Sequence, residues 1–385
     1  MKKVFSALFL VFLAAMCVGT IGRALTYTIH DVYVGYGGGV KGLILTALDR
    51  SAIEKSVRND VLLHNGWIEL FGASMRAAGV DVLVENDGKR LARLADDSLA
   101  FVNIVEPEFA AEQTESIASL RDAAVSAGAE CMFVSIPKKI CPTQSHFCAR
   151  GIRDESNRTS EMRIAAFAAA GYDVLDLHAR MHEEGLSHPS LYFRTDHHWT
   201  PQAGLWAAGE IARALGIDDA LLAPELFEEE RHPASFLGSE GKHLGSRYCA
   251  MDDFNIPYPT YETELTFQSD DDAPRTGVFL DALLYRERME GNPYKVSAYV
   301  AMLNGDNGIQ RIRNHRMPQG RRILLIKDSF TNAMAGYLAL ACAEVDLIDL
   351  RHTDVSAPQF ARDGGYDAVL VTISAQSENK AFIFI

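Results

Sequence analysis

Cysteine is scarce in this 385-residue chain, and none of its six cysteines forms a CxxC pair. The spacing typical of a zinc ribbon or a dithiol redox motif is therefore missing. Cys141 and Cys148 flank the hexapeptide PTQSHF and could close a small disulfide loop in an oxidising compartment. Removal of Cys17 with an N-terminal leader would leave five cysteines, so at least one would stay unpaired.

Positive charge is also in deficit. The 37 lysines and arginines against 51 aspartates and glutamates give a formal net charge of −14, which argues against a nucleic-acid partner. The chain has no fixed-period repeat and no low-complexity tract. A composition of 48% hydrophobic and 23% charged residues predicts a folded protein, either one large α/β core with an insertion or two domains.

One long uncharged run, VFSALFLVFLAAMCVGTIG, follows two lysines at the N-terminus. A short basic region before an apolar stretch is typical of a secretory signal, and this run is nearly long enough to span a bilayer. Gly22 and Ala24 supply small residues at a candidate cleavage site. We therefore expect residues 1–24 to be a signal peptide or an N-terminal membrane anchor, and the rest of the chain to be extracytoplasmic.

Short apolar runs rich in β-branched residues alternate with helical patterns through much of the remaining chain. The strands predicted from these runs are residues 129–137, 172–177, 321–330, 344–351 and 366–374. Continuous apolar segments such as ILLI and AVLV fit strands that are buried on both faces. The sequence therefore predicts an α/β fold, a mostly parallel sheet with helices on both faces.

Two regions depart from this alternation within a predicted domain of residues 25–385. Residues 222–320 are rich in Gly, Pro, Tyr and Asp, and we interpret them as an irregular insertion with short strands of its own. Residues 25–106 are partly helical in pattern and are expected to lead into the core.

The stretch FRTDHHWTPQAG concentrates polar chemistry at a predicted helix start, with Thr200 as N-cap and Pro201 at the first helical position. In an extended segment, side chains two residues apart share a face. Asp196 and His198 are then expected to point the same way and His197 to point away. An acid beside a histidine can fix the imidazole tautomer and stabilise the imidazolium that forms on protonation.

Simpler interpretations of the same residues remain open. The two histidines could be ordinary surface residues, or could bind zinc, although adjacent histidines are a weak metal signal. Trp199 is expected to pack the loop against the following helix.

Ser329 is a candidate nucleophile to accompany this pair. The strand predicted at 323–326 ends at Lys327-Asp328, and a helix is expected to start near Phe330 or Thr331. A hydroxyl at this turn lies at the carboxyl edge of the sheet, where α/β folds build their sites, and near a helix N-terminus, which favours an oxyanion. Asp328 is expected to accept hydrogen bonds within the turn. Alternatively, Ser329 is simply an N-cap.

The motifs TDHHW and KDSF together resemble the DHHW protein family, which is similar to the SGNH-hydrolase-like proteins of alginate O-acetylation. The weaker segments GWIELFG, FVSIPKK, FLGS, VDLIDLR and YDAVLV extend the resemblance over most of the chain after the leader. The resemblance implies an SGNH or flavodoxin-like fold with a permuted motif order, because the usual SGNH order places the serine first. It further implies Ser329 as nucleophile, His198 as general base and Asp196 as the acid that orients it.

The implied activity is serine-dependent acyl transfer, by an O-acetyltransferase or an esterase acting on a cell-surface or secreted polysaccharide. No cofactor and no metal are expected, and a membrane-bound O-acyltransferase is the implied donor partner. The usual SGNH oxyanion donors, a Gly and an Asn, have no clear counterpart. Arg351, Ser374 and Gln376 follow the relevant strands, and the backbone N–H of Ser329 is the best-supported donor.

Other residues and functions remain as alternatives. Tyr299 and the segment 304–306 are candidates to face the site, although a plain turn is the preferred interpretation of 304–306. A non-catalytic carbohydrate-binding or assembly protein on the same scaffold is the second function, since a fold does not dictate a function. A metal site around Asp196 and His198 would need further ligands. His188, His243 and His352 are available for it, but their spacing makes no pattern.

Overall fold

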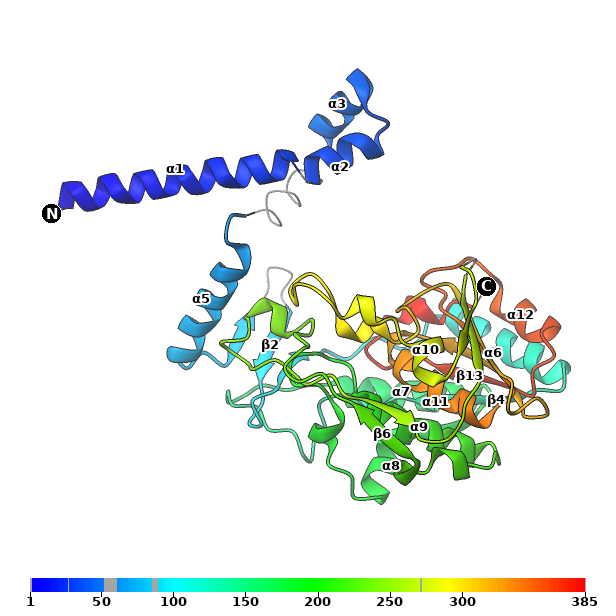
Figure 1. The fold of residues 1–385 in the computed structure, drawn as a ribbon. Coiled ribbons are helices and arrows are strands. Elements are labelled where there is room, and N and C mark those ends of the chain that lie inside the picture. The colour runs from blue at the N-terminus through cyan, green and yellow to red at the C-terminus, as the bar shows by residue number, and fades with distance from the viewer. Residues whose placement is uncertain (1, 27, 52–60, 85–88, 271, 385) are drawn as a thin grey trace. The chain divides into compact units, whose positions relative to one another are not determined.

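The computed structural model describes residues 2–26, 28–51, 61–84, 89–270 and 272–384, and the chain forms two compact units, residues 1–74 and 75–385. The first unit is helical. It comprises α1 (Lys2–Thr26), α2 (Thr28–Gly35), α3 (Gly39–Leu48) and most of α5 (His64–Ala77), drawn in blue in Figure 1. Among the described residues, α1 included, no helix combines the length and the apolarity that crossing a bilayer requires.

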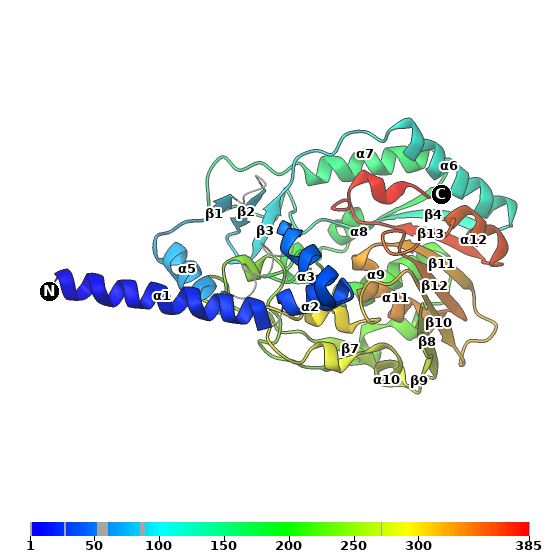
Figure 2. The same cartoon turned by 90° about the horizontal axis from the view of Figure 1, so that it is seen from above.

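An eight-stranded sheet forms the centre of the second unit, in the order β5-β4-β13-β11-β12-β10-β8-β9. Figure 2 shows β4, β13, β11, β12, β10, β8 and β9 following one another across the sheet. The first five strands run parallel to one another, and the last three add antiparallel pairs. The parallel strands are β4 (Glu130–Ser135), β5 (Asp173–Asp176), β11 (Arg322–Lys327), β12 (Glu344–Ile348) and β13 (Ala368–Thr372). All five lie within the predicted strand segments.

Side chains of β11 alternate between two hydrophobic cores, one on each face of the sheet. Ile323 and Leu325 join the core that includes residues of α9 and α11, whereas Leu324 and Ile326 join the core that includes residues of α6, α7 and α12. A strand covered on both faces must be apolar at every position, which explains the continuous run in the sequence. The predicted α/β fold with helices on both faces is confirmed.

Most helices of this unit precede or follow a parallel strand, whereas α10 lies between the antiparallel strands β9 and β10. They are α6 (Ala111–Ser126), α7 (Ser156–Ala169), α8 (Leu177–Glu183), α9 (Pro201–Ala214), α10 (Phe279–Leu283), α11 (Asn332–Leu338) and α12 (Ala357–Asp363). The α9 start is the predicted one, since Thr200 Oγ1 accepts a hydrogen bond from the N–H of Ala203 at 3.3 Å.

The segment 222–320 contains two kinds of strand. β6 (Phe227–Glu230) and β7 (Ile256–Pro259) pair only with each other. By contrast, β8 (Leu265–Ser269), β9 (Arg275–Gly277) and β10 (Ile309–Asn314) extend the main sheet beyond β12. Part of the expected insertion is thus continuous with the core sheet. A smaller antiparallel sheet, β1 (Val82–Val84), β2 (Arg90–Arg93) and β3 (Leu99–Val102), precedes α6.

Candidate active site

Ser329 lies directly beyond the carboxyl end of β11, which has β12 on one side and β13 on the other. The strand ends at Lys327, a short 3₁₀ turn covers Ser329–Thr331, and α11 follows from Asn332. This is the strand–turn–helix arrangement expected from the sequence, and it places the hydroxyl at the edge where parallel sheets carry their sites.

The Asp328 carboxylate fixes this turn. One oxygen accepts the N–H of Phe330 at 3.1 Å, as expected for a bond within the turn. The other accepts the N–H of Ser374 and the hydroxyl of Ser377, both at 2.7 Å. Asp328 therefore also ties the Ser329 turn to the loop that follows β13.

Ser329, His198 and Asp196 form a continuous chain of hydrogen bonds. Ser329 Oγ lies 2.7 Å from His198 Nε2, and His198 Nδ1 lies 2.5 Å from Asp196 Oδ1. The same Asp196 oxygen accepts the backbone N–H of His198 at 3.0 Å, so a single carboxylate sets both the loop and the ring. The structure thus brings together the three residues proposed from the sequence, although 131 positions separate His198 from Ser329.

Aromatic side chains enclose the imidazole of His198. The ring of Tyr299 stacks on it, with ring centroids 3.9 Å apart and planes 16° from parallel. The centroid of the Phe330 ring lies 4.9 Å from that of His198. The Tyr299 hydroxyl donates to the carbonyl of Ser329 at 3.1 Å, and Trp199 Nε1 donates to the carbonyl of Phe330 at 2.8 Å. Trp199 packs as expected, being 1% exposed, and it joins the histidine loop to the serine turn.

Asp196 is buried, and neighbouring segments hold it from two sides. Its second oxygen accepts the N–H of Ser239 at 2.6 Å, while its carbonyl accepts the ammonium of Lys139 at 2.8 Å. Lys139 is itself paired with the buried Glu240 at 2.7 Å. Gly238 allows this approach, because a Cβ at that position would overlap the Cβ of Asp196. The weakly diagnostic sequence segments FVSIPKK and FLGS therefore supply the support for Asp196.

The charge on Asp196 is stabilised within the site. Burial alone would raise its pKa, but His197, His198 and the hydrogen bonds from His198 and Ser239 outweigh this and hold the pKa well below its usual range. An ionised carboxylate at Nδ1 selects the tautomer whose Nε2 is free to accept the Ser329 proton.

The prediction that His197 points away from the pair is wrong. Its ring lies 3.9 Å from that of His198, and its Nδ1 lies 2.9 Å from the Ser239 hydroxyl. The reason is that the segment bends back on itself, with the N–H of Phe193 bonded to the carbonyl of His198 at 3.2 Å. The alternation of an extended strand therefore does not apply here. Burial and the neighbouring His198 lower the pKa of His197 to about 3.

The positions expected to supply oxyanion donors are mostly occupied by other bonds. The N–H of Ser374 is bonded to Asp328, and the N–H and guanidinium of Arg351 are bonded to Asp349. Gln376 is half-buried. The backbone N–H of Ser329 has no hydrogen-bond acceptor among the described residues, and it therefore stays the best-supported donor.

Sequence reasoning missed a buried charge network beside the serine turn. The ammonium of Lys327 contacts Asp306 at 3.0 Å, Asn332 at 2.9 Å and Asp349 at 3.3 Å. Arg351 also contacts Asp306, at 3.0 Å. Burial opposes ionisation of Asp306, but Lys327 and Arg351 lower its pKa to about 2. The segment 304–306 therefore does more than form a turn, since its aspartate anchors the strand end that carries Ser329.

The candidate metal ligands distant from Asp196 do not gather around it within the described part of the chain. His188 Nε2 is bonded to the carbonyl of Lys138, the ring of His243 packs on Phe101, and His352 lies in a separate group with Asp306 and Asp349. The sequence left open whether Cys141 and Cys148 form a disulfide; both are free thiols in this structure. The Cys141 sulfur contacts Thr143 and His182, and the Cys148 thiol donates to the carbonyl of Leu94.

Two family models match the sequence. One, described as the SGNH hydrolase-like domain of acetyltransferase AlgX, matches residues 102–243, and the other, described as DHHW protein, matches residues 179–348. Asp196 and His198 fall inside both ranges, and Ser329 falls inside the second. The resemblance predicted from TDHHW and KDSF is confirmed. Among curated proteins, none matches this chain.

Solved structures show the same fold. A DHHW family protein from Eubacterium siraeum is 20% identical with a TM-score of 0.59, covering 79% of this chain and 97% of that chain. Bacillus cereus PatB1 is 18% identical with a TM-score of 0.60, covering 77% of this chain and 100% of that chain. A second PatB1 structure, with a sulfonyl adduct, has the same identity and TM-score and is covered over 98% of its length. The chain thus shares the α/β fold of these structures and resembles the DHHW family over residues 179–348.

Proposed function

We propose that this chain is an exported serine-dependent acyl-transfer enzyme, an O-acetyltransferase or esterase acting on a cell-surface or secreted polysaccharide. The observation that carries the proposal is the hydrogen-bonded series Ser329–His198–Asp196, with contacts of 2.7 and 2.5 Å. Distances of this size allow direct proton transfer. The match to an acetyltransferase family model supports the acyl-transfer class.

In the proposed mechanism, His198 Nε2 takes the Ser329 proton while Oγ attacks the acyl carbonyl carbon. Asp196 stabilises the imidazolium, and the backbone N–H of Ser329 donates to the developing oxyanion. The protonated His198 then gives its proton to the departing group, leaving an acyl-enzyme. A polysaccharide hydroxyl next gives its proton to His198 and attacks the ester, which restores Ser329; water in this role makes the protein an esterase.

Export follows from the proposed role of residues 1–24 as a signal peptide or membrane anchor. An extracytoplasmic enzyme has no direct access to cytoplasmic acyl donors. We therefore propose that a membrane-bound O-acyltransferase passes the acetyl group to Ser329. Neither proposed reaction step requires a metal or a cofactor.

The test is the acyl-transfer rate of Ser329→Ala, with p-nitrophenyl acetate as donor and a polysaccharide as acceptor. We expect kcat/KM to fall by at least about a thousandfold, because a triad without its nucleophile loses most of its rate enhancement. Ser190→Ala is the matched control, since Ser190 is exposed and its hydroxyl donates to the Ser187 carbonyl of the same turn. Equal rates in Ser329→Ala and the wild type would refute the assignment.

A non-catalytic polysaccharide-binding protein is the second candidate function. It is favoured by the observation that Ser374 and Arg351 use their backbone N–H groups in bonds to Asp328 and Asp349. If it is correct, the wild type binds polysaccharide but shows no turnover, and Ser329→Ala binds equally well.

A further inference from the structure

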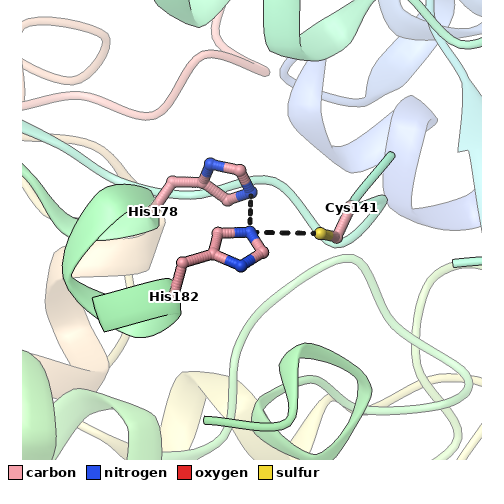
Figure 3. Close-up of side chains that lie close together, drawn as sticks. All are labelled: Cys141, His178 and His182. Atoms are coloured by element: carbon pink, nitrogen blue, oxygen red, sulfur yellow. Dashed lines mark hydrogen bonds between the residues drawn. The ribbon is translucent and has the colours of Figure 1, made fainter. Parts of the chain in front are cut away.

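Three side chains with metal-binding atoms lie close together: Cys141, which follows β4, and His178 and His182 of α8. His178 and His182 lie four residues apart on α8, so both rings emerge from the same helix face. Figure 3 shows a nitrogen of His182 facing both the His178 ring and the sulfur of Cys141, which lies on the loop after β4. The three ligand atoms lie within 4.8 Å of one another. The residues of the proposed triad do not take part in this cluster.

Two of the three separations between these atoms match those around a tetrahedral ion, and the third, between Cys141 and His178, lies within 4.8 Å. The Nε2 atoms of His178 and His182 are 3.2 Å apart, and Cys141 Sγ lies 3.5 Å from His182 Nε2. Bonds of about 2.05 Å to nitrogen and about 2.3 Å to sulfur place tetrahedral ligand atoms about 3.3 Å (N···N) and about 3.6 Å (N···S) apart. The preference for zinc rests on the donor set, because two imidazoles and one thiolate are typical zinc ligands.

We propose that Cys141, His178 and His182 bind one Zn²⁺ ion, with a water molecule in the fourth position. Two imidazoles and a thiolate are donors that zinc prefers, and the i, i+4 histidine pair presents both nitrogens without distortion of the helix. His182 is exposed and gives the ion access, while Cys141 is buried. When the zinc–sulfur bond forms, the Cys141 thiol releases its proton to solvent.

The ion would act as a clip between the loop after β4 and α8. Cys141 comes two residues after Lys139, whose ammonium holds the carbonyl of Asp196 at 2.8 Å. His182 is anchored on a helix whose first turn is capped by the Asp176 carboxylate. Binding therefore fastens α8 to the loop that carries Lys139.

The experiment measures metal binding to the purified full chain after treatment with a chelator. Zn²⁺ is titrated in competition with a chromophoric chelator, and Co²⁺ serves as a spectroscopic probe. We expect one Zn²⁺ per chain, a higher melting temperature with Zn²⁺, and a thiolate-to-cobalt charge-transfer band. Cys141→Ser should abolish that band, and His182→Ala should weaken Zn²⁺ binding by at least about tenfold, the loss caused by removing even an outer-shell partner.

Cys148→Ser and His146→Ala are the matched controls, because they change a thiol and an exposed histidine of the same loop outside the cluster. Unchanged binding in Cys141→Ser and His182→Ala would overturn the proposal, and the cluster would then be only hydrogen-bonded. Loss of binding in His198→Ala instead would place the ion at the proposed triad and equally overturn it. A Cys141–Cys148 disulfide in the purified chain, detected by peptide mass, would leave no Cys141 thiolate to bind the ion and would also overturn the proposal.

Discussion

Asp196 is the residue on which the geometry of the candidate site depends most. One of its oxygens contacts both the N–H and the ring of His198, and the other is held by the N–H of Ser239. An amide in its place could no longer stabilise the imidazolium or enforce the productive tautomer. We expect Asp196→Asn to lower kcat by about 10⁴-fold with little change in KM. Kinetics with p-nitrophenyl acetate, alongside circular dichroism, measure this; a loss below tenfold would rule out the orienting role.

His197 predicts a pH dependence of stability. Its pKa is lowered to about 3, so between about pH 6.5 and pH 3 the unfolded chain binds a proton at this ring that the folded chain does not. The contribution of His197 to the free energy of unfolding is therefore complete above pH 6.5 and is lost progressively as the pH falls from 6.5 toward 3. We expect His197→Asn to flatten the decline in the free energy of unfolding between pH 7 and pH 5, measured by urea titration. A decline in the variant as steep as that of the wild type would contradict the lowered pKa of His197 as its cause.

Tyr299 has two separable contributions, a hydroxyl and a ring. The hydroxyl donates to the carbonyls of Ser329 and Phe330, whereas the ring stacks on His198. Tyr299→Phe removes only the hydrogen bonds and should lower the free energy of unfolding by about 1 kcal/mol. Tyr299→Leu also removes the stacked ring, so it should be the more damaging to acyl transfer. Urea unfolding measures the stability of the two variants, and kcat measures their acyl transfer. Equal losses of kcat in Tyr299→Phe and Tyr299→Leu would contradict a role for the ring.

At the scale of elements, helix α9 follows the histidine loop and α11 follows the serine turn, and the two helices meet at Gly204. A Cβ there would overlap the carbonyl of Ala333 on α11. We expect Gly204→Ala to push the helices apart, to destabilise the fold by about 1–3 kcal/mol and to lower activity. Gly209→Ala on the same helix is the control, because its Cβ would meet only the Arg213 side chain at 3.6 Å. It should be neutral or stabilising. Equal effects of the two substitutions would refute the close approach.

The sequence could predict the elements whose pattern is local. The apolar run of β11 and the Thr200-Pro201 start of α9 follow from periodicity and capping, and both lie where expected. The side of the chain to which His197 turns could not be predicted, because it depends on a bend closed by the Phe193–His198 backbone bond.

Long-range partners were also beyond the sequence pattern. Lys139 and Ser239 reach Asp196 from segments 57 and 43 positions away, and nothing local marks them as its supports. Similarly, β8 and β10 are seen to extend the main sheet only from their pairing, β10 with β12 and β8 with β10. The i, i+4 spacing of His178 and His182 was visible in the sequence, but its significance required the approach of Cys141.

At the scale of the whole molecule, the proposal requires export of the second unit. We predict that the chain, expressed in a bacterial cell with its leader, is recovered outside the cytoplasm. N-terminal sequencing then separates the two expectations for residues 1–24, since a start near residue 25 indicates cleavage and an intact leader in the membrane fraction indicates an anchor. Recovery of the intact chain only from the cytoplasm would contradict export.

Activation of Ser329 by His198 should make the serine hydroxyl unusually reactive, and covalent labelling measures that reactivity. Purified full-length protein is treated with a sulfonyl fluoride, and the adduct is located by peptide mass spectrometry. We expect one adduct per chain, on Ser329, with labelling strongly slowed in His198→Ala and absent in Ser329→Ala. A wild-type protein that stays unlabelled, or that is labelled at another residue while Ser329 remains free, would contradict it.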